Sequence, residues 1–309
     1  MMDQLIQRFP EQLVEAMQIG ENAVIKPHDK AINKVYVAGL GGSGIGANFV
    51  QEFIKDSCPI PYAVGKGYSI PNYVDENTLA ICSSYSGNTE ETLSAYEQML
   101  KTGAKIVIVS SGGKLIKEAQ ERGFDYIQVP GDWPSPRACL GFSIVQQLYV
   151  MNKLNFINDD FKGQLRSSID LVKFDIEDIQ KAAKKVADKI YDKLPIIYTT
   201  DRMESVAVRL RQQINENAKM LCWHHVIPEM NHNELVGWTE AHPNKAVIYL
   251  RNHDDYKRNQ VRIDINQKII GKYTENIIDI FFKVKSFSSV CFKYCFISFI
   301  LFYSQLNRT

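Results

Sequence analysis

Short apolar runs alternate with amphipathic stretches along most of this chain. Runs that are rich in β-branched and aromatic residues and too short for helices are typical of buried parallel strands. They occupy residues 34–40, 61–64, 77–83, 105–110 and 125–129. The intervening segments 47–55, 90–102 and 114–122 have helical spacing, and a further helix precedes the first strand. Regular alternation of strand and helix predicts an α/β fold with a parallel sheet covered on both faces.

A second series of the same kind follows. Residues 177–192 carry apolar side chains at helical spacing, and a strand at 194–199, a helix at 203–220 and a strand at 245–250 come next. The polar stretch 155–166 is the expected junction between the two series. We therefore expect two tandem doubly wound parallel-sheet domains, at residues 1–152 and 153–309.

Charge and cysteine content exclude several classes of protein. Thirty-six basic and 35 acidic residues give a net charge of +1 in 309 residues, so neither nucleic acid nor an anionic membrane is an expected partner. The six cysteines are scattered without a C-x-x-C pair, and the amphipathic, charged segment 1–21 is unlike a signal peptide. These features predict a cytoplasmic protein.

Composition changes abruptly at residue 281. Seven of the fifteen phenylalanines lie in 281–309, which contains no glycine, proline or acidic residue. A buried helix and a membrane span are both interpretations of this segment. The apolar run 287–303 is barely long enough to cross a bilayer, and Lys293 interrupts it. We favour a third view, in which the second domain has an atypical end.

A glycine-rich segment follows the first predicted strand directly. It reads GLGGSGIG from Gly39 to Gly46 and precedes a predicted helix. Glycine allows a ligand to approach the backbone, and a helix N-terminus favours an anion. Gly39, Gly41 and Gly44 also satisfy the G-x-G-x-x-G pattern of dinucleotide sites, but the next strand ends near Lys66 rather than at an acidic residue. Tight packing of strand against helix would by itself explain the glycines.

Hydroxyl side chains follow the third predicted strand. Ser84, Ser86 and Thr89 surround Gly87 at the start of a helix and could bind a phosphate monoester together with unpaired backbone N–H groups. The simpler interpretation is a helix cap formed by Asn88 or Thr89. A cap uses one hydroxyl, so three around one glycine favour phosphate binding.

Together these motifs resemble the sugar isomerase (SIS) domain. Later segments narrow the resemblance to the bifunctional phosphoglucose/phosphomannose isomerase family, which has two such domains; they read PRACLG from Pro136, NENAK from Asn215 and EMNHNE from Glu229. The resemblance covers about residues 35–280. It implies isomerisation of glucose 6-phosphate, and of mannose 6-phosphate, to fructose 6-phosphate by proton transfer through an enediolate. Gly42, Ser43, Ser84, Ser86 and Thr89 would then bind the phosphate of the substrate.

The resemblance also assigns catalytic roles. Arg137 would neutralise the enediolate or position the sugar hydroxyls, and Glu216 would carry the proton between carbon atoms. Helical spacing puts Glu216 near the end of a helix on a partly covered face, where burial would raise its pKa. Without the resemblance, Arg137 would be a surface ion pair and Glu216 a solvated helix carboxylate.

His232 resembles the histidine that opens the sugar ring and that a partner subunit contributes in this family. The resemblance therefore implies a homodimer. His224, His225, Glu229 and His232 have the spacing of no standard metal site. Isomerisation by proton transfer needs neither a metal nor another cofactor, and we expect none.

The C-terminal segment departs from the family pattern. Members carry a lysine near the C-terminus, but neither Lys283, Lys285 nor Lys293 lies in a matching motif. A shifted reading frame and a divergent ending are both open explanations. Two other functions also remain open. One is a sugar-phosphate-binding protein with impaired catalysis, which is favoured if the altered C-terminal segment is real and Glu216 faces solvent. The other is a dehydrogenase, which the three glycines alone support.

Overall fold

The computed structural model describes residues 2–282 and divides them into two compact units. The N-terminal unit is Arg8–Arg166, and the C-terminal unit consists of α1 (Met2–Gln7) and the described chain from Ser167 onward. The division falls inside the long helix α7 (Asp160–Ile190), whereas the predicted boundary lies after residue 152. The expected helix or membrane span at 287–303 lies outside the described residues.

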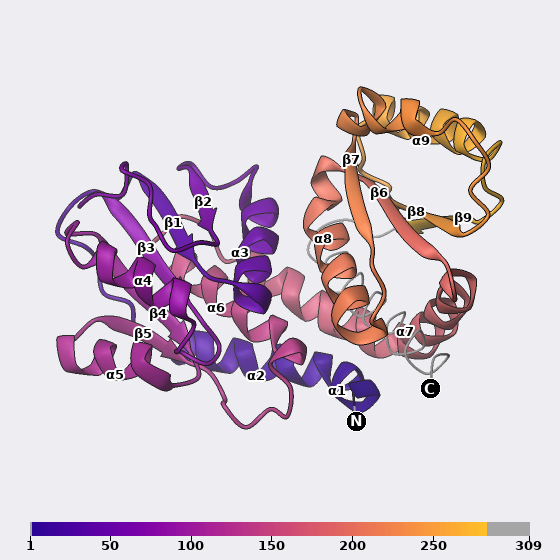
Figure 1. Cartoon of the computed structure of the whole chain (residues 1–309). Coiled ribbons are helices and arrows are strands. Elements are labelled where there is room, and N and C mark those ends of the chain that lie inside the picture. The colour runs from indigo at the N-terminus through magenta and orange to yellow at the C-terminus, as the bar shows by residue number, and fades with distance from the viewer. Residues whose placement is uncertain (1, 283–309) are drawn as a thin grey trace. The chain divides into compact units, whose positions relative to one another are not determined.

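A five-stranded, entirely parallel sheet forms the centre of the N-terminal unit (Figure 1). Its order is β2-β1-β3-β4-β5, and its strands are β1 (Lys34–Ala38), β2 (Tyr62–Gly65), β3 (Thr78–Ser83), β4 (Lys105–Ser110) and β5 (Asp125–Gln128). All five correspond to predicted strands. β3 is buried along its whole length, as expected for a central parallel strand.

Helices cover both faces of this sheet. Side chains of α4 (Glu90–Met99) and α5 (Gly113–Arg122) share one hydrophobic cluster with β1, β3 and β4. Helix α6 (Leu140–Lys153) packs against both α2 (Phe9–Asn22) and α3 (Gly41–Ile54). Helix α6 was not predicted, because it is buried around most of its circumference and has no clear amphipathic period.

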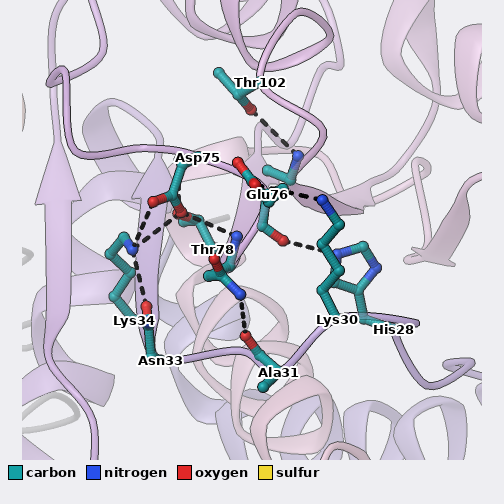
Figure 2. Close-up of polar contacts among 11 residues, drawn as sticks. His28, Lys30, Ala31, Asn33, Lys34, Asp75, Glu76, Thr78 and Thr102 are labelled. Atoms are coloured by element: carbon teal, nitrogen blue, oxygen red, sulfur yellow. Dashed lines mark hydrogen bonds and ion pairs between the residues drawn. The ribbon is translucent and has the colours of Figure 1, made fainter.

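A network of polar side chains lies at the end of the sheet where strands β1 and β3 begin (Figure 2). Lys34 Nζ lies 3.0 Å from Asp75 Oδ1, and Thr78 donates to the same carboxylate. Nearby, Lys30 pairs with the Glu76 carboxylate at 3.3 Å, and His28 Nε2 donates to the Glu76 carbonyl. All strands of a parallel sheet begin at the same end, and ligands of such sheets bind at the opposite end, where the strands finish.

The C-terminal unit contains a four-stranded parallel sheet in the order β7-β6-β8-β9. Its strands are β6 (Leu194–Thr200), β7 (Trp223–Ile227), β8 (Lys245–Asn252) and β9 (Ile277–Phe282), and its helices include α8 (Glu204–Gln213) and α9 (Lys257–Ile270). One face of the sheet shares a hydrophobic cluster with α9 and with Met230 and Trp238 of the loop after β7.

Three of these elements, β7, β9 and α9, were not predicted from the sequence. β7 is an edge strand whose apolar run is interrupted by His224 and His225, and β9 merges with the phenylalanine-rich segment. α9 has little apolar periodicity. Among the described residues, no helix is both long and apolar enough to cross a bilayer.

Candidate active site

The glycine-rich segment forms the first turn of a helix rather than a separate loop. α3 begins at Gly41, six residues before the predicted start at Ala47, and its first turn contains Gly42 and Ser43. A Cβ on Gly44 would overlap the carbonyl oxygen of Gly39, so the helix can begin this close to β1 only with glycine there. The first N–H groups of α3 lack intrahelical partners, and they follow the carboxyl end of β1 directly.

The second motif lies beside the first. β1 and β3 are neighbours in the sheet, and a Cβ on Gly39 would lie 2.8 Å from the Ser83 carbonyl oxygen. α4 begins at Glu90, directly after the hydroxyl cluster. Two helix N-termini therefore meet at one sheet edge, which is a favourable arrangement for an anion.

The hydroxyls of Ser84 and Thr89 form a hydrogen bond with each other, and the Thr89 hydroxyl makes none with the backbone of α4. Their hydroxyl oxygens are 2.8 Å apart, and Ser84 Oγ also accepts a hydrogen bond from Gly87 N at 3.1 Å. Thr89 is the N-cap residue of α4, yet its side chain makes no capping hydrogen bond. The simpler interpretation of Thr89 as a helix cap is therefore wrong, because its hydroxyl contacts Ser84 instead.

The three hydroxyls differ in accessibility. Ser84 is 2% exposed, Thr89 is half-buried and Ser86 is exposed. Ser86 Oγ accepts from Asn88 N at 3.2 Å, and Asn88 Oδ1 accepts from Lys114 N at 2.9 Å. Ser84 thus shapes the loop from inside, while Ser86 and Thr89 are accessible from outside.

The loop after β5 brings Arg137 to the same edge. Arg137 lies in the short helix η1 (Pro136–Ala138), and a Cβ on Gly42 would lie 4.0 Å from the Pro136 carbonyl oxygen. Gln12 of α2, which is fully buried, donates to the Ala138 carbonyl at 2.8 Å and accepts from Gly141 N at 2.9 Å. Gln12 was not predicted as part of the site, since a lone glutamine in an amphipathic helix gives no sequence signal.

Glu216 lies in the C-terminal unit, on the π-helical turn Ile214–Ala218 that follows α8. Ile214 and Ala218 are buried, but Glu216 is exposed. The predicted partial burial of Glu216 is therefore wrong, because the wider turn changes the angular position that α-helical spacing gives. Turns of this kind are common at functional sites.

His232 follows the short helix η4 (Glu229–Asn231) and is exposed. His224 and His225 lie in strand β7. Across residues 2–282, no group of three or more histidine, cysteine or acidic side chains is arranged to hold a metal. The structure thus groups Gly42, Ser43, Ser84, Ser86, Thr89 and Arg137 in one unit and puts Glu216 and His232 in the other.

Comparison with known proteins decides the family. The SIS domain model matches residues 30–132, and the model of the bacterial phospho-glucose isomerase C-terminal SIS domain matches residues 179–298. A bifunctional phosphoglucose/phosphomannose isomerase of Caldicellulosiruptor bescii is 39% identical over 287 residues, which cover 89% of this chain and 84% of the relative. The chain belongs to the bifunctional phosphoglucose/phosphomannose isomerase family.

Other members and solved structures agree with this membership. The Aquifex aeolicus isomerase of the family is 35% identical over 77% of this chain and 73% of its own length. The C-terminal domain of glucosamine-fructose-6-phosphate aminotransferase from Francisella tularensis has the same fold, with a TM-score of 0.77 and 12% identity over 99% of this chain and 95% of that domain. The two tandem SIS domains that we predicted are confirmed.

The family match also extends further than we predicted. The C-terminal domain model continues to residue 298, past Ile280, where we expected the resemblance to fade. Lys283, Lys285 and Lys293 fall inside this match and outside the described residues.

Proposed function

We propose that this chain interconverts glucose 6-phosphate, and mannose 6-phosphate, with fructose 6-phosphate through an enediolate. The observation that carries the proposal is the pair of helix N-termini, α3 and α4, that begin at adjacent strand ends beside the Ser84–Thr89 hydroxyl pair. This arrangement supplies uncharged donors for a phosphate dianion. Family membership supplies the reaction class.

The phosphate of the substrate binds the N-terminal domain in this proposal. Backbone N–H groups of Gly42 and Ser43 and the hydroxyls of Ser86 and Thr89 donate to its oxygens, while Ser84 orients Thr89. The phosphate contacts hold the hexose in place for proton transfer without taking part in it.

Proton transfer uses the remaining residues that resemble those of the family. His232 takes the proton from the anomeric hydroxyl and returns it to the ring oxygen, which opens the ring. Glu216 then removes the proton on C2 and delivers it to C1, while the electron pair passes through the enediolate. The hydroxyl proton on O2 is transferred to O1, so that C1 becomes a hydroxymethyl group and C2 becomes the ketone carbonyl. Arg137 stabilises the negative oxygen that develops in this step.

The partner in this proposal is a second copy of the chain. His232 is exposed in a single chain, which is compatible with a role at the active site of a homodimer partner. We further propose a cytoplasmic location, with the phosphate-binding domain at residues 1–152 and the second domain at residues 153–309.

Exchange of the C2 proton of glucose 6-phosphate with deuterated water tests the proposal. The wild-type chain should exchange it, and Glu216→Gln should not. Glu240→Gln, which alters another exposed carboxylate of the C-terminal unit, is the matched control and should exchange normally. Exchange that persists in Glu216→Gln would remove Glu216 from the mechanism. Binding of fructose 6-phosphate by the wild-type chain without any exchange would identify a binding protein instead.

A further inference from the structure

The loop that carries His232 is anchored on both sides of that residue. On the preceding side, Asn231 Nδ2 donates to Asn266 Oδ1 of α9 at 2.7 Å, and Asn266 Nδ2 contacts Met230 Sδ at 3.5 Å. Asn266 is 1% exposed, so these contacts attach the loop to the buried side of α9.

On the following side, Glu234 begins the short helix η5 (Glu234–Gly237) and is bonded to two strands. Its Oε1 accepts a hydrogen bond from Tyr198 Oη of β6 and another from Trp223 Nε1 of β7, the latter at 3.0 Å. Trp238 Nε1, four residues further along the loop, donates to Tyr198 Oη at 3.1 Å.

The direction of these hydrogen bonds is determined by chemistry. The indole N–H of tryptophan can only donate, so Tyr198 accepts from Trp238 and uses its own proton on Glu234. Burial, followed by the hydrogen bond to Glu234, raises the pKa of Tyr198, so its hydroxyl keeps that proton. The Glu234 carboxylate is therefore the final acceptor of both sets of hydrogen bonds. One set runs from Trp238 through Tyr198, and the other comes directly from Trp223.

The backbone between the two anchors is also fixed. His232 N donates to the Glu229 carbonyl at 2.9 Å, and Asn233 Oδ1 accepts from Glu234 N at 2.6 Å. Asn233 Nδ2 donates to the Glu229 carboxylate at 3.1 Å. The backbone at His232 is held, although its side chain is exposed.

We propose that Glu234 is a positioning residue, which acts by holding the 229–238 loop in the conformation that presents His232 to the sugar ring. This inference rests on the proposed ring-opening role of His232. Glu234 itself contacts no substrate atom and transfers no proton.

Two substitutions at Glu234 separate positioning from simple packing. Glu234→Ala removes the acceptor and should lower kcat on the order of 10²-fold, the cost of a small misplacement of a catalytic group. KM should stay nearly constant because the phosphate binds other residues. Glu234→Gln keeps an oxygen acceptor for Tyr198 and Trp223 and should retain most of the activity. Glu240→Ala is the matched control and should behave as wild type.

A double-mutant cycle supplies a measurement that a purely structural role would not change. In a His232→Ala background, Glu234→Ala should change kcat by no more than about twofold, because there is no histidine left to position. Tyr198→Phe, which keeps the ring but loses the hydroxyl, should reduce kcat in the wild-type background and not in the His232→Ala background. Tyr198→Phe also keeps the test decisive should Glu234→Ala fail to fold.

The outcomes are distinct. Glu234→Ala with wild-type kcat would overturn the proposal, as would equal loss of kcat with and without His232. Full activity of His232→Ala would contradict the proposed ring-opening role and the positioning role with it. The ring-opening role of His232 and the positioning role of Glu234 are both supported if the losses of kcat in the cycle are non-additive and Glu234→Gln retains activity.

Discussion

The hydroxyl oxygen of Thr89 lies 2.8 Å from that of Ser84, although Thr89 occupies the position at which a threonine normally caps its own helix. The consequence is that the first N–H groups of α4 keep no side-chain cap from Thr89 and can bind a ligand instead.

Thr89→Val keeps the side-chain shape and removes this hydroxyl. The substitution should raise KM for fructose 6-phosphate by about 10-fold to 100-fold, because a hydrogen bond to a charged group contributes about 1.5–3 kcal/mol. Steady-state kinetics measure this directly. Thr89→Ser retains the hydroxyl and serves as the control, and an unchanged KM in Thr89→Val would exclude contact between Thr89 and the phosphate.

Gly87 has a positive φ of 68°, and a Cβ there would overlap the Gly112 carbonyl oxygen. Gly87→Ala should therefore lower the free energy of unfolding by about 1–3 kcal/mol, as strain of this type does, and should weaken phosphate binding as well. Urea denaturation measures the first effect. Gly67→Ala, where a Cβ would meet nothing within 4 Å, should leave stability near the wild-type value.

Lys105 and Asp125 form an ion pair of 2.6 Å between β4 and β5, with side chains only 13% and 6% exposed. Lys105→Met leaves the Asp125 carboxylate without its cation and should cost about 3–5 kcal/mol of unfolding free energy. Lys114→Met breaks the pair with Glu97, whose side chains are 47% and 60% exposed, and should cost no more than about 1 kcal/mol. Equal losses in the two variants would show that burial of the pair is unimportant.

Burial, and then the charge of Arg211, lowers the pKa of His224 from its ordinary value of 6.5. The unfolded chain therefore binds this proton more readily than the folded chain. The free energy of unfolding should fall as the pH drops below 6.5 and level off below the pKa of the folded state.

His224→Gln should reduce this loss of stability at acidic pH. Urea denaturation of both proteins from about pH 5 to pH 8 measures the difference. His253→Gln, at an exposed position, should keep the wild-type pH dependence. If His224→Gln also keeps the wild-type pH dependence, His224 does not contribute to the loss of stability at acidic pH.

Much of the fold followed from local patterns. Each predicted strand was found, because a buried parallel strand needs a continuous apolar run. Strand β7 and helix α9 were missed, since neither has a clear apolar period and both depend on Ile227, Ile263 and Ile270 packing in one core. The family also followed from short segments, each of which is local in sequence.

The sequence by itself determined which residues are present at the ends of the strands and which family the chain belongs to. Only the tertiary structure decided that Ser84 is buried against Thr89, that the π-helical turn exposes Glu216, and that Tyr198, Trp223 and Glu234 meet. The physical reason is the distance along the chain over which each kind of interaction acts. Periodicity and turn chemistry act over a few residues, whereas these contacts join side chains whose relative positions depend on how the sheets and loops pack.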